Sequence, residues 1–248
     1  MRKSTTNETN PLQEPTAKNF MGELMAMNKK VGAENAKFVR ADENVNRFLN
    51  VPMSNIFSLA KQFMAMPLKE IEALLDNDLY EARVGAVSIM DFQARDKKVS
   101  EESRKALFEL YINHHDRIDN WDLVDRSAPY VVGGYLSDKP RKILYKLAKS
   151  KNVWERRTAI VATYFFIRQN DLDDTFNIAE LLVNDKHDMV NKAVGSWVRE
   201  AGKRDHRKLI AFLDKHAATM PRITLRYAIE KLDKKLKDHY LNMSKITP

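Results

Sequence analysis

The sequence predicts an all-α protein built from repeated pairs of helices. Glycine and proline are scarce, at 7 and 8 of 248 residues, while alanine, leucine, lysine and glutamate, which favour helices, are common. Apolar residues recur every three or four positions, as at Phe20, Leu24 and Met27, and no segment alternates convincingly as a strand would. Similar segments also return along the chain at the interval of a helix pair.

Composition excludes several classes of protein. Hydrophobic residues make up 44% of the chain, so a substantial core is expected at this length. The absence of cysteine excludes disulfides, thiolate metal sites and a cysteine nucleophile. The sequence contains no run of about 18 uncharged apolar residues, so no membrane span is predicted. The N-terminus also lacks the apolar stretch of a secretory signal. We therefore expect a cytoplasmic protein, with no cofactor and no bound metal.

In order along the chain, a short tail precedes a repeated region. Residues 1–14 are polar and are expected to form a flexible tail, followed by a single repeat domain over residues 15–248. Five segments of that domain resemble one another, at residues 81–87, 124–130, 155–161, 190–196 and 225–231. Their central alanines stand 42, 31, 34 and 35 residues apart, at Ala86, Ala128, Ala159, Ala193 and Ala228. A second helix is expected between successive segments, at residues 141–148, 175–183 and 207–216.

A small residue at the same place in each repeat lets neighbouring helices approach closely. Helix pairs of this period are HEAT-like. Stacked pairs form a curved solenoid with a concave groove, and this groove is the predicted DNA-binding surface. The alternative is an ordinary helical bundle whose intervals agree by chance. The stretch over residues 130–136 comes nearest to a strand, but it continues the helix expected from Trp121. It is interpreted as helix that weakens or ends at its glycine pair.

Helix boundaries carry the expected local signals. Pro129, Pro140 and Pro221 fall at or near predicted helix boundaries or first turns, where a missing N–H costs least. The run over residues 171–174, DLDD, supplies capping side chains and negative charge for the helix that follows. The pair of histidines at 114 and 115 lacks the spacing of metal ligands and is interpreted as a surface pair at a helix end.

Positive charge is concentrated in the second half of the chain. The whole chain carries +8, but residues 139–248 hold 24 Lys and Arg against 13 Asp and Glu, a net charge of +11. A polyanion such as nucleic acid is the natural partner of such a surface, although a basic protein need not have one. Five basic residues gather in and after the fourth repeat, at Arg199, Lys203, Arg204, Arg207 and Lys208. They form either a solvated face or a set of phosphate contacts.

Trp121 and Asp125 are the most informative pair in the sequence. A separation of four residues places the indole and the carboxylate on one helix face, where together they can stabilise a cation. Arg157 falls near the equivalent position one repeat later, so its guanidinium can lie beside Asp125 and remain available to a phosphate. Arg156 points about 100° away and serves packing or the surface, from where it is a candidate DNA contact. The alternative is structural, with Trp121 in the core and Asp125 in an ordinary ion pair.

The segments around these residues resemble the DNA alkylation repair glycosylases of the AlkD type. The resemblance rests on residues 120–125 (NWDLVD), 154–160 (WERRTAI) and 192–200 (KAVGSWVRE). It covers roughly residues 33–232, and the combination of Trp-x-x-x-Asp with Trp-x-x-Arg at this separation is fairly specific. Either motif alone would be a weak signal.

The resemblance implies a monofunctional DNA glycosylase that binds duplex DNA in a concave groove of HEAT-like repeats. Enzymes of this family remove positively charged alkylated purines, such as 3-methyladenine and 7-methylguanine, without inserting the base into a deep pocket. In this interpretation Asp125 stabilises the electron-poor sugar and positions water, Trp121 contacts the sugar, and Arg157 holds a phosphate and orients the aspartate. We expect a monomer, associated with the nucleoid when bound to DNA, with no membrane contact and no obligate protein partner.

Two positions depart from the family pattern. The family's second groove tryptophan follows the glycine of a Lys-Ala-(Ile/Val)-Gly-Trp run, but Ser196 stands there and the tryptophan is Trp197. A shift of one residue rotates a side chain by about 100°, so either Trp197 still faces the groove as a catalytic residue or one aromatic wall is missing. Phe38 stands where some members carry a tyrosine beside the DNA. The alternative functions are a non-catalytic module that binds DNA or a protein, and an RNA-binding or scaffold solenoid.

Overall fold

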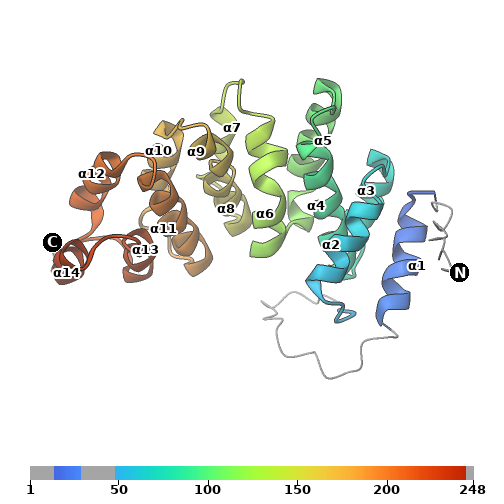
Figure 1. Ribbon diagram of the computed structural model, residues 1–248, viewed down its shortest axis with the longest axis horizontal. Helices are drawn as coiled ribbons and strands as arrows, with labels where there is room; N and C mark the ends of the chain where they lie inside the picture. The colour runs from blue at the N-terminus through green and yellow to red at the C-terminus, as the bar shows by residue number, and fades with distance from the viewer. Residues whose placement is uncertain (1–13, 29–47, 244–248) are drawn as a thin grey trace, which may run out of the picture. The chain divides into compact units, whose positions relative to one another are not determined.

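The computed structural model describes residues 14–28 and 48–243, and the regular elements in these ranges are helices, with no β-strand among them (Figure 1). The all-α prediction is therefore confirmed. The chain divides into two compact units, residues 1–93 and 94–248. The single domain expected over residues 15–248 stays a prediction, and the expected tail lies outside the described residues except for Glu14. No helix in the described ranges is both long and apolar enough to cross a membrane.

The first unit is formed by α1 (Ala17–Asn28), α2 (Met53–Gln62), α3 (Leu68–Leu75) and most of α4 (Tyr80–Arg95). Each of the first three helices buries apolar residues three or four positions apart, as the sequence pattern predicts. Phe20 of α1 packs edge-on against Phe63, with ring centroids 5.4 Å apart. These contacts give the first unit a core of its own.

The second unit arranges its helices in two rows. The first row is α6 (Trp121–Ser127) with its π-helical continuation η3 (Ala128–Gly134), then α8 (Val153–Val161), α11 (Asp188–Gly202) and α13 (Arg222–Ala228), each packed on the next. The second row, above it in Figure 1, contains α7 (Lys142–Leu147), α10 (Asp173–Leu182) and α12 (His206–His216). The remaining helices of the unit are α5 (Glu101–Asn113), the 3-10 turn η2 (His115–Arg117), α9 (Tyr164–Arg168) and α14 (Lys234–Asn242).

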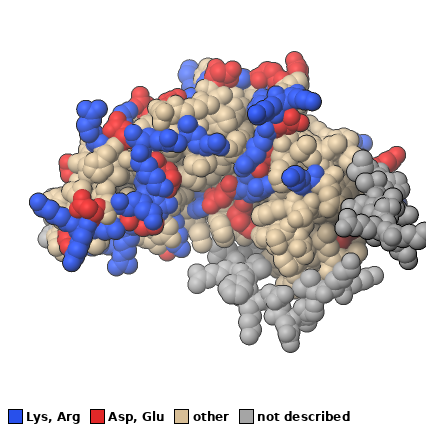
Figure 2. Space-filling view, viewed as in Figure 1, with Lys and Arg blue, Asp and Glu red and all other residues tan. Residues whose placement is uncertain are grey.

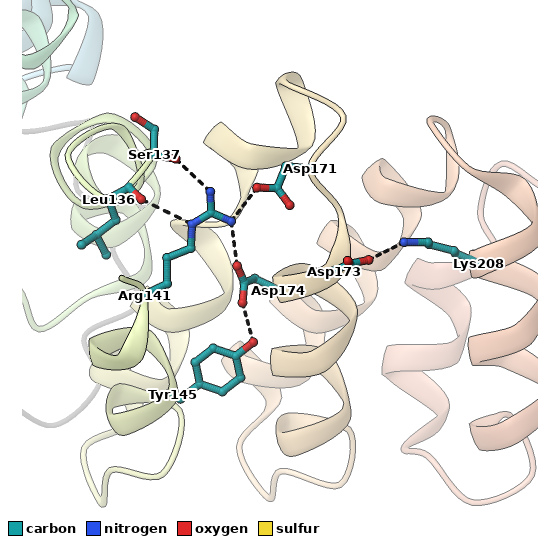
Figure 3. Close-up of polar contacts among 8 residues, drawn as sticks. All are labelled: Leu136, Ser137, Arg141, Tyr145, Asp171, Asp173, Asp174 and Lys208. Carbon is teal, nitrogen blue, oxygen red and sulfur yellow. Dashed lines mark hydrogen bonds and ion pairs between the residues drawn. The ribbon is translucent and has the colours of Figure 1, made fainter. Parts of the chain in front are cut away.

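Polar contacts join side chains that lie one repeat apart, which confirms the predicted repeat fold. In the second row, Arg141 Nη1 lies 2.7 Å from carboxylate oxygens of both Asp171 and Asp174, which are 30 and 33 residues further on (Figure 3). One repeat later Lys208 donates to Asp173, across 35 residues (Figure 3). The acidic run was predicted to cap α10, but its N-terminus has no side-chain cap bond. Asp171 and Asp174 bind Arg141 instead, because a guanidinium that is largely covered needs charged partners.

Neighbouring helices of the first row approach closely where glycine replaces a larger residue. A Cβ atom added to Gly195 of α11 would lie 2.5 Å from the Thr224 carbonyl oxygen and 2.6 Å from Tyr227 Cβ, both on α13. A Cβ atom on Gly133 of η3 would lie 2.2 Å from the Ala162 carbonyl oxygen. Since the obstructing atoms are mainly backbone, these two glycines set how close the helices can come.

We expect Gly195→Ala to lower the free energy of unfolding by about 1–3 kcal/mol, because the added methyl group forces α11 and α13 apart. Gly22→Ala is the matched control, since a Cβ atom at Gly22 meets nothing within 4 Å. That control should be stabilising, by up to about 1 kcal/mol, through helix propensity. Urea unfolding followed by circular dichroism measures both. Equal effects of the two substitutions would contradict the close approach at Gly195.

Candidate functional site

Asp125 of α6 and Arg157 of α8 form a bidentate ion pair in the first row. Arg157 Nε donates to Asp125 Oδ1 at 3.0 Å, and Nη2 donates to Oδ2 at 2.8 Å. The carboxylate side chain is 33% exposed, whereas the arginine side chain is only 8% exposed. A bidentate contact fixes the plane of the carboxylate. The pair therefore presents an oriented carboxylate to solvent and keeps the guanidinium behind it.

Arg157 also reaches the next helix of the row. Its Nη1 donates to the carbonyl oxygen of Met189, at the start of α11. One guanidinium thus binds α6, α8 and α11 together, and three of its five N–H groups are used within the protein. Little of the group is left open to a phosphate. The geometry favours the orienting role predicted for Arg157 over the phosphate-holding role.

Trp121 lies at the solvent-facing start of α6. Its side chain is 47% exposed, and its backbone N–H is capped by Asn120 Oδ1 at 2.8 Å. The structural alternative, in which Trp121 fills the core, is therefore wrong. Four residues later on the same helix, Asp125 is also open to solvent. Together these two residues place an aromatic ring and a carboxylate on one accessible face.

A buried polar network lies directly behind the ion pair. Thr158 Oγ1, next in sequence to Arg157, is 2.9 Å from both Tyr111 Oη and His115 Nε2. Ser127 of α6 is also buried, and its hydroxyl donates to the Leu123 carbonyl at 2.7 Å. Burial raises the pKa of the Tyr111 phenol, and the nearby charge of Asp125 adds to this effect. The network joins α5, α6 and α8, so it fixes the backbone positions from which Asp125 and Arg157 project.

His115 is the least expected member of this network. It was predicted to lie on the surface, but it is only 4% exposed, because η2 turns it inward beneath α8. Burial lowers the pKa of His115, so the ring is neutral near pH 7 although Glu155 and Asp116 favour its charged form. Its Nδ1 is buried and has no hydrogen-bond partner in the described structure. We therefore assign the proton to Nε2, which donates to Thr158.

Trp197, predicted to be catalytic, is partly buried and packs against a small hydrophobic cluster of the second unit. Its ring lies 4.9 Å from that of Tyr164 on α9, and it covers the buried cluster of Ile167, Leu172 and Ala201. The indole Nε1 is buried and has no partner among the described residues. The ring therefore packs on α9, on the start of α10 and on its own helix α11. Among the described contacts, the Trp197 ring has none with Asp125. The shift of one residue relative to the family pattern thus favours the interpretation in which one aromatic wall is missing.

Four of the predicted DNA contacts are bound by acids of the protein itself. Arg156 makes a bidentate pair with Asp185, at 2.6 and 3.1 Å, and donates to the carbonyl oxygens of Ser150 and Lys151. These bonds join two repeats and use most of the donors of Arg156, and its contact with DNA stays a prediction. The other three pairs are Arg199 with Glu200 and Glu230, Lys203 with Glu200, and Lys208 with Asp173.

Arg204 and Arg207 are exposed, and Asp205 lies between them in sequence, where its carboxylate accepts from the Arg207 backbone N–H at 3.0 Å. With Arg199, Lys203 and Lys208 they lie around the C-terminal end of α11 and the start of α12. The Met189 carbonyl, which accepts from Arg157, is at the N-terminal end of α11. A helix of this length separates its two ends by about 20 Å, so the basic residues lie far along α11 from the Asp125–Arg157 pair. Figure 2 shows Lys and Arg gathered with interspersed acids over the C-terminal helices, on the left of the view. Phe38 lies outside the described residues, so its predicted contact is untested.

One comparison with known proteins gives the family and another supports the fold. Residues 14–232 match the family model described as DNA alkylation repair enzyme. A solved structure titled as a predicted DNA alkylation repair enzyme from Enterococcus faecalis resembles this one with a TM-score of 0.60. The match covers 90% of this chain and 99% of that chain at 17% identity, so it is evidence for the fold. No curated protein matches the sequence.

We expect acid to weaken the fold through His115. Because burial holds the pKa of His115 below its unfolded value of about 6.5, the unfolded chain takes up the proton first as the pH falls. The stability that the neutral ring contributes is present above about pH 6.5 and is lost below it. His115→Gln keeps a donor for Thr158 but does not titrate. Its free energy of unfolding should fall less than that of the wild type between about pH 7.5 and about pH 5.5.

The matched control is His206→Gln, because His206 is exposed at the start of α12. This variant should keep the pH dependence of the wild type in the same urea titrations. A His115→Gln protein that loses as much stability as the wild type would contradict the buried neutral imidazole.

Proposed function

Because this chain belongs to the DNA alkylation repair enzyme family, we propose that it is a monofunctional DNA glycosylase that removes cationic alkylated purines from duplex DNA. The observation that carries the proposal is the oriented, solvent-facing carboxylate of Asp125, with Trp121 one helical turn away. A carboxylate on the DNA side of the protein cannot bind a phosphate but can stabilise a positive charge that develops on the sugar.

The chemistry of the substrate fits this arrangement. Alkylation at N3 or N7 gives the purine a positive charge, so the base leaves readily when the bond between C1′ and N9 breaks. The bonding electrons neutralise the departing purine, and the deoxyribose becomes positively charged near C1′. A carboxylate held close to that carbon stabilises the developing charge without forming a covalent bond. Water then adds to C1′, and its proton passes to Asp125 or to solvent.

Trp121 and Arg157 have supporting roles in this proposal. The exposed indole of Trp121 offers a π face to the electron-poor sugar, as aromatic rings do toward cations. Arg157 is a positioning residue, because its contacts hold Asp125 in one orientation and its own side chain is covered. Asp125 and Trp121 both lie on an exposed helix face, so in this proposal they approach the sugar of the damaged nucleotide from outside the duplex. The damaged base does not have to enter a deep pocket in the protein.

A second candidate is a non-catalytic module that binds duplex DNA. Ser196 stands where the family pattern has a groove tryptophan, and Trp197 packs on Tyr164. Loss of one aromatic wall would weaken the hold on a sugar and leave phosphate binding intact. Both candidate functions predict that the protein binds duplex DNA, but only the glycosylase predicts release of the damaged base.

We expect Asp125→Asn to slow the release of 7-methylguanine from duplex DNA by about 10²-fold or more, because the amide keeps the shape of the carboxylate without its charge. Duplex affinity should persist in this variant. Asp138→Asn is the control for charge, since Asp138 is 77% exposed and paired with Lys139. Chromatography of released bases measures the rate. If the wild type releases no 7-methylguanine but still binds duplex DNA, the glycosylase proposal fails and the non-catalytic binding module is supported.

We also expect the rate to depend on the charge of the lesion. Stabilisation by a carboxylate helps most when the leaving base is already cationic, so 7-methylguanine should be released far faster than neutral O6-methylguanine in the same duplex. The comparison uses equal concentrations of two oligonucleotides that differ only in the lesion. Equal rates for the two lesions would rule out the electrostatic mechanism.

A further inference from the structure

A half-buried histidine caps the helix whose first turn binds Arg157. His187 directly precedes α11, and its Nδ1 accepts a hydrogen bond from the backbone N–H of Met189 at 3.2 Å. The carbonyl oxygen of the same methionine accepts from Arg157 Nη1. Both backbone groups of Met189 are therefore bound by side chains, one by the cap and the other by the guanidinium that orients Asp125.

Trp154 of α8 packs against the ring of His187. The indole is only 8% exposed, and the two ring centroids lie 6.1 Å apart with their planes inclined at 66°. Trp154 precedes Arg157 by three residues, so the two side chains project from one face of α8. One contacts His187 and the other contacts Met189, two residues further on. Successive turns of α8 thus contact the start of α11 at two adjacent points.

The backbone that carries the cap is fixed as well. The N–H of His187 donates to Asp185 Oδ1 at 2.8 Å. Asp185 is held in turn by its bidentate pair with Arg156, and its side chain is only 6% exposed. Because the loop is already held, the imidazole loses little further freedom when it accepts the Met189 bond. The position of the ring is set by α8 and by the loop that precedes α11.

The tautomer of the cap follows from its bond. Nδ1 accepts from an N–H group, so it carries no proton, and we assign the ring proton to Nε2. Asparagine supplies an equivalent acceptor at the N-cap of a helix, whereas alanine supplies none. These two replacements at His187 therefore separate the acceptor from the rest of the imidazole.

We propose that His187 is a positioning residue of the candidate active site. Its cap fixes the first turn of α11, where the Met189 carbonyl holds one part of the Arg157 guanidinium, and the rest of that group fixes the plane of the Asp125 carboxylate. A displaced start of α11 would thus move the carboxylate relative to the sugar. The inference rests on the proposed function for the reaction affected, and it gives Trp154 the role of supporting the cap.

A comparable cap at α14 lies outside this series of bonds. Asp233 accepts from the Leu236 backbone N–H at 2.9 Å. Among the described contacts, neither of these residues binds Arg157 or Asp125. Loss of this cap weakens a helix of the same unit without acting on the ion pair. Asp233→Ala is therefore the matched control for His187→Ala.

Single-turnover release of 7-methylguanine from duplex DNA, with the protein in excess, tests the role of the cap. We expect His187→Ala to slow this release by about 10-fold or more, because a small displacement of a catalytic group is costly. His187→Asn should restore most of the rate, since it returns the acceptor. Both variants should keep the duplex affinity of the wild type in fluorescence anisotropy, and Asp233→Ala should keep the rate.

A second measurement follows Arg157 itself and does not depend on catalysis. NMR of the isotope-labelled protein detects the Arg157 Nε–H, which is assigned by its absence in Arg157→Lys. This donor is bonded to Asp125, so His187→Ala should shift or broaden its signal, and His187→Asn should return the signal to the wild-type position. Circular dichroism checks that each variant is folded.

The inference is overturned if an active enzyme keeps its rate in His187→Ala, if His187→Asn fails to restore a lost rate, or if Asp233→Ala loses as much. The outcomes also distinguish it from the proposed function. If the wild type releases no base but the Arg157 signal follows the cap, the positioning contact stands and the glycosylase proposal fails. If base release depends on Asp125 while rate and signal are unaffected by loss of the cap, the enzyme stands and this inference fails.

Discussion

The guanidinium of Arg157 is the contact on which the second unit and its candidate site both depend. It binds Asp125 on one neighbouring helix and the Met189 carbonyl on another, while it is almost fully covered itself. Removing the carboxylate of Asp125 would leave the covered guanidinium of Arg157 without its charged partner, which is costly because a buried charge needs compensation. Stability and site geometry are therefore tied to one side chain. The carboxylate offered to a substrate is the same group that completes the packing of three helices.

Comparable bonds recur at other steps between repeats. They join residues 29–35 positions apart, so each connects one helix pair to the next and adds a nearest-neighbour term to the stability of the stack. The pairs are Arg156 with Asp185, Arg141 with Asp171 and Asp174, Arg199 with Glu230, Lys208 with Asp173, and Lys215 with Glu180. The five basic side chains in these pairs are consequently engaged by acids of the protein itself.

The sequence was sufficient for the helix content, the repeat period and the Asp125–Arg157 pair, because each of these follows from spacing along the chain. It was insufficient wherever the result depends on packing between helices. The shift of one residue turns the Trp197 ring toward Tyr164, where it is partly buried. Arg156 pairs with Asp185, which lies in a loop that no local sequence pattern connects to it. His115 is buried because a short 3-10 turn follows α5, and the polar residue type gave no signal of this burial. The cap at His187 was missed for the same reason, since its partners come from α8 and α11.

The π-helical continuation of α6 has a consequence for how this segment can change in evolution. An α-helix repeats its faces every 3.6 residues, whereas hydrogen bonds from i to i+5 accommodate extra chain within the same length. The widened turns of η3 thereby reset the direction of every side chain that follows, including the aromatic ring at Tyr130, relative to Asp125 before them. Losing a single residue here would return the run to ordinary helical phase and point the two ends at different neighbours. A change of length in this stretch would therefore disturb the packing on both sides of it, whereas a change of length in a loop between helices would not shift the phase of a helix.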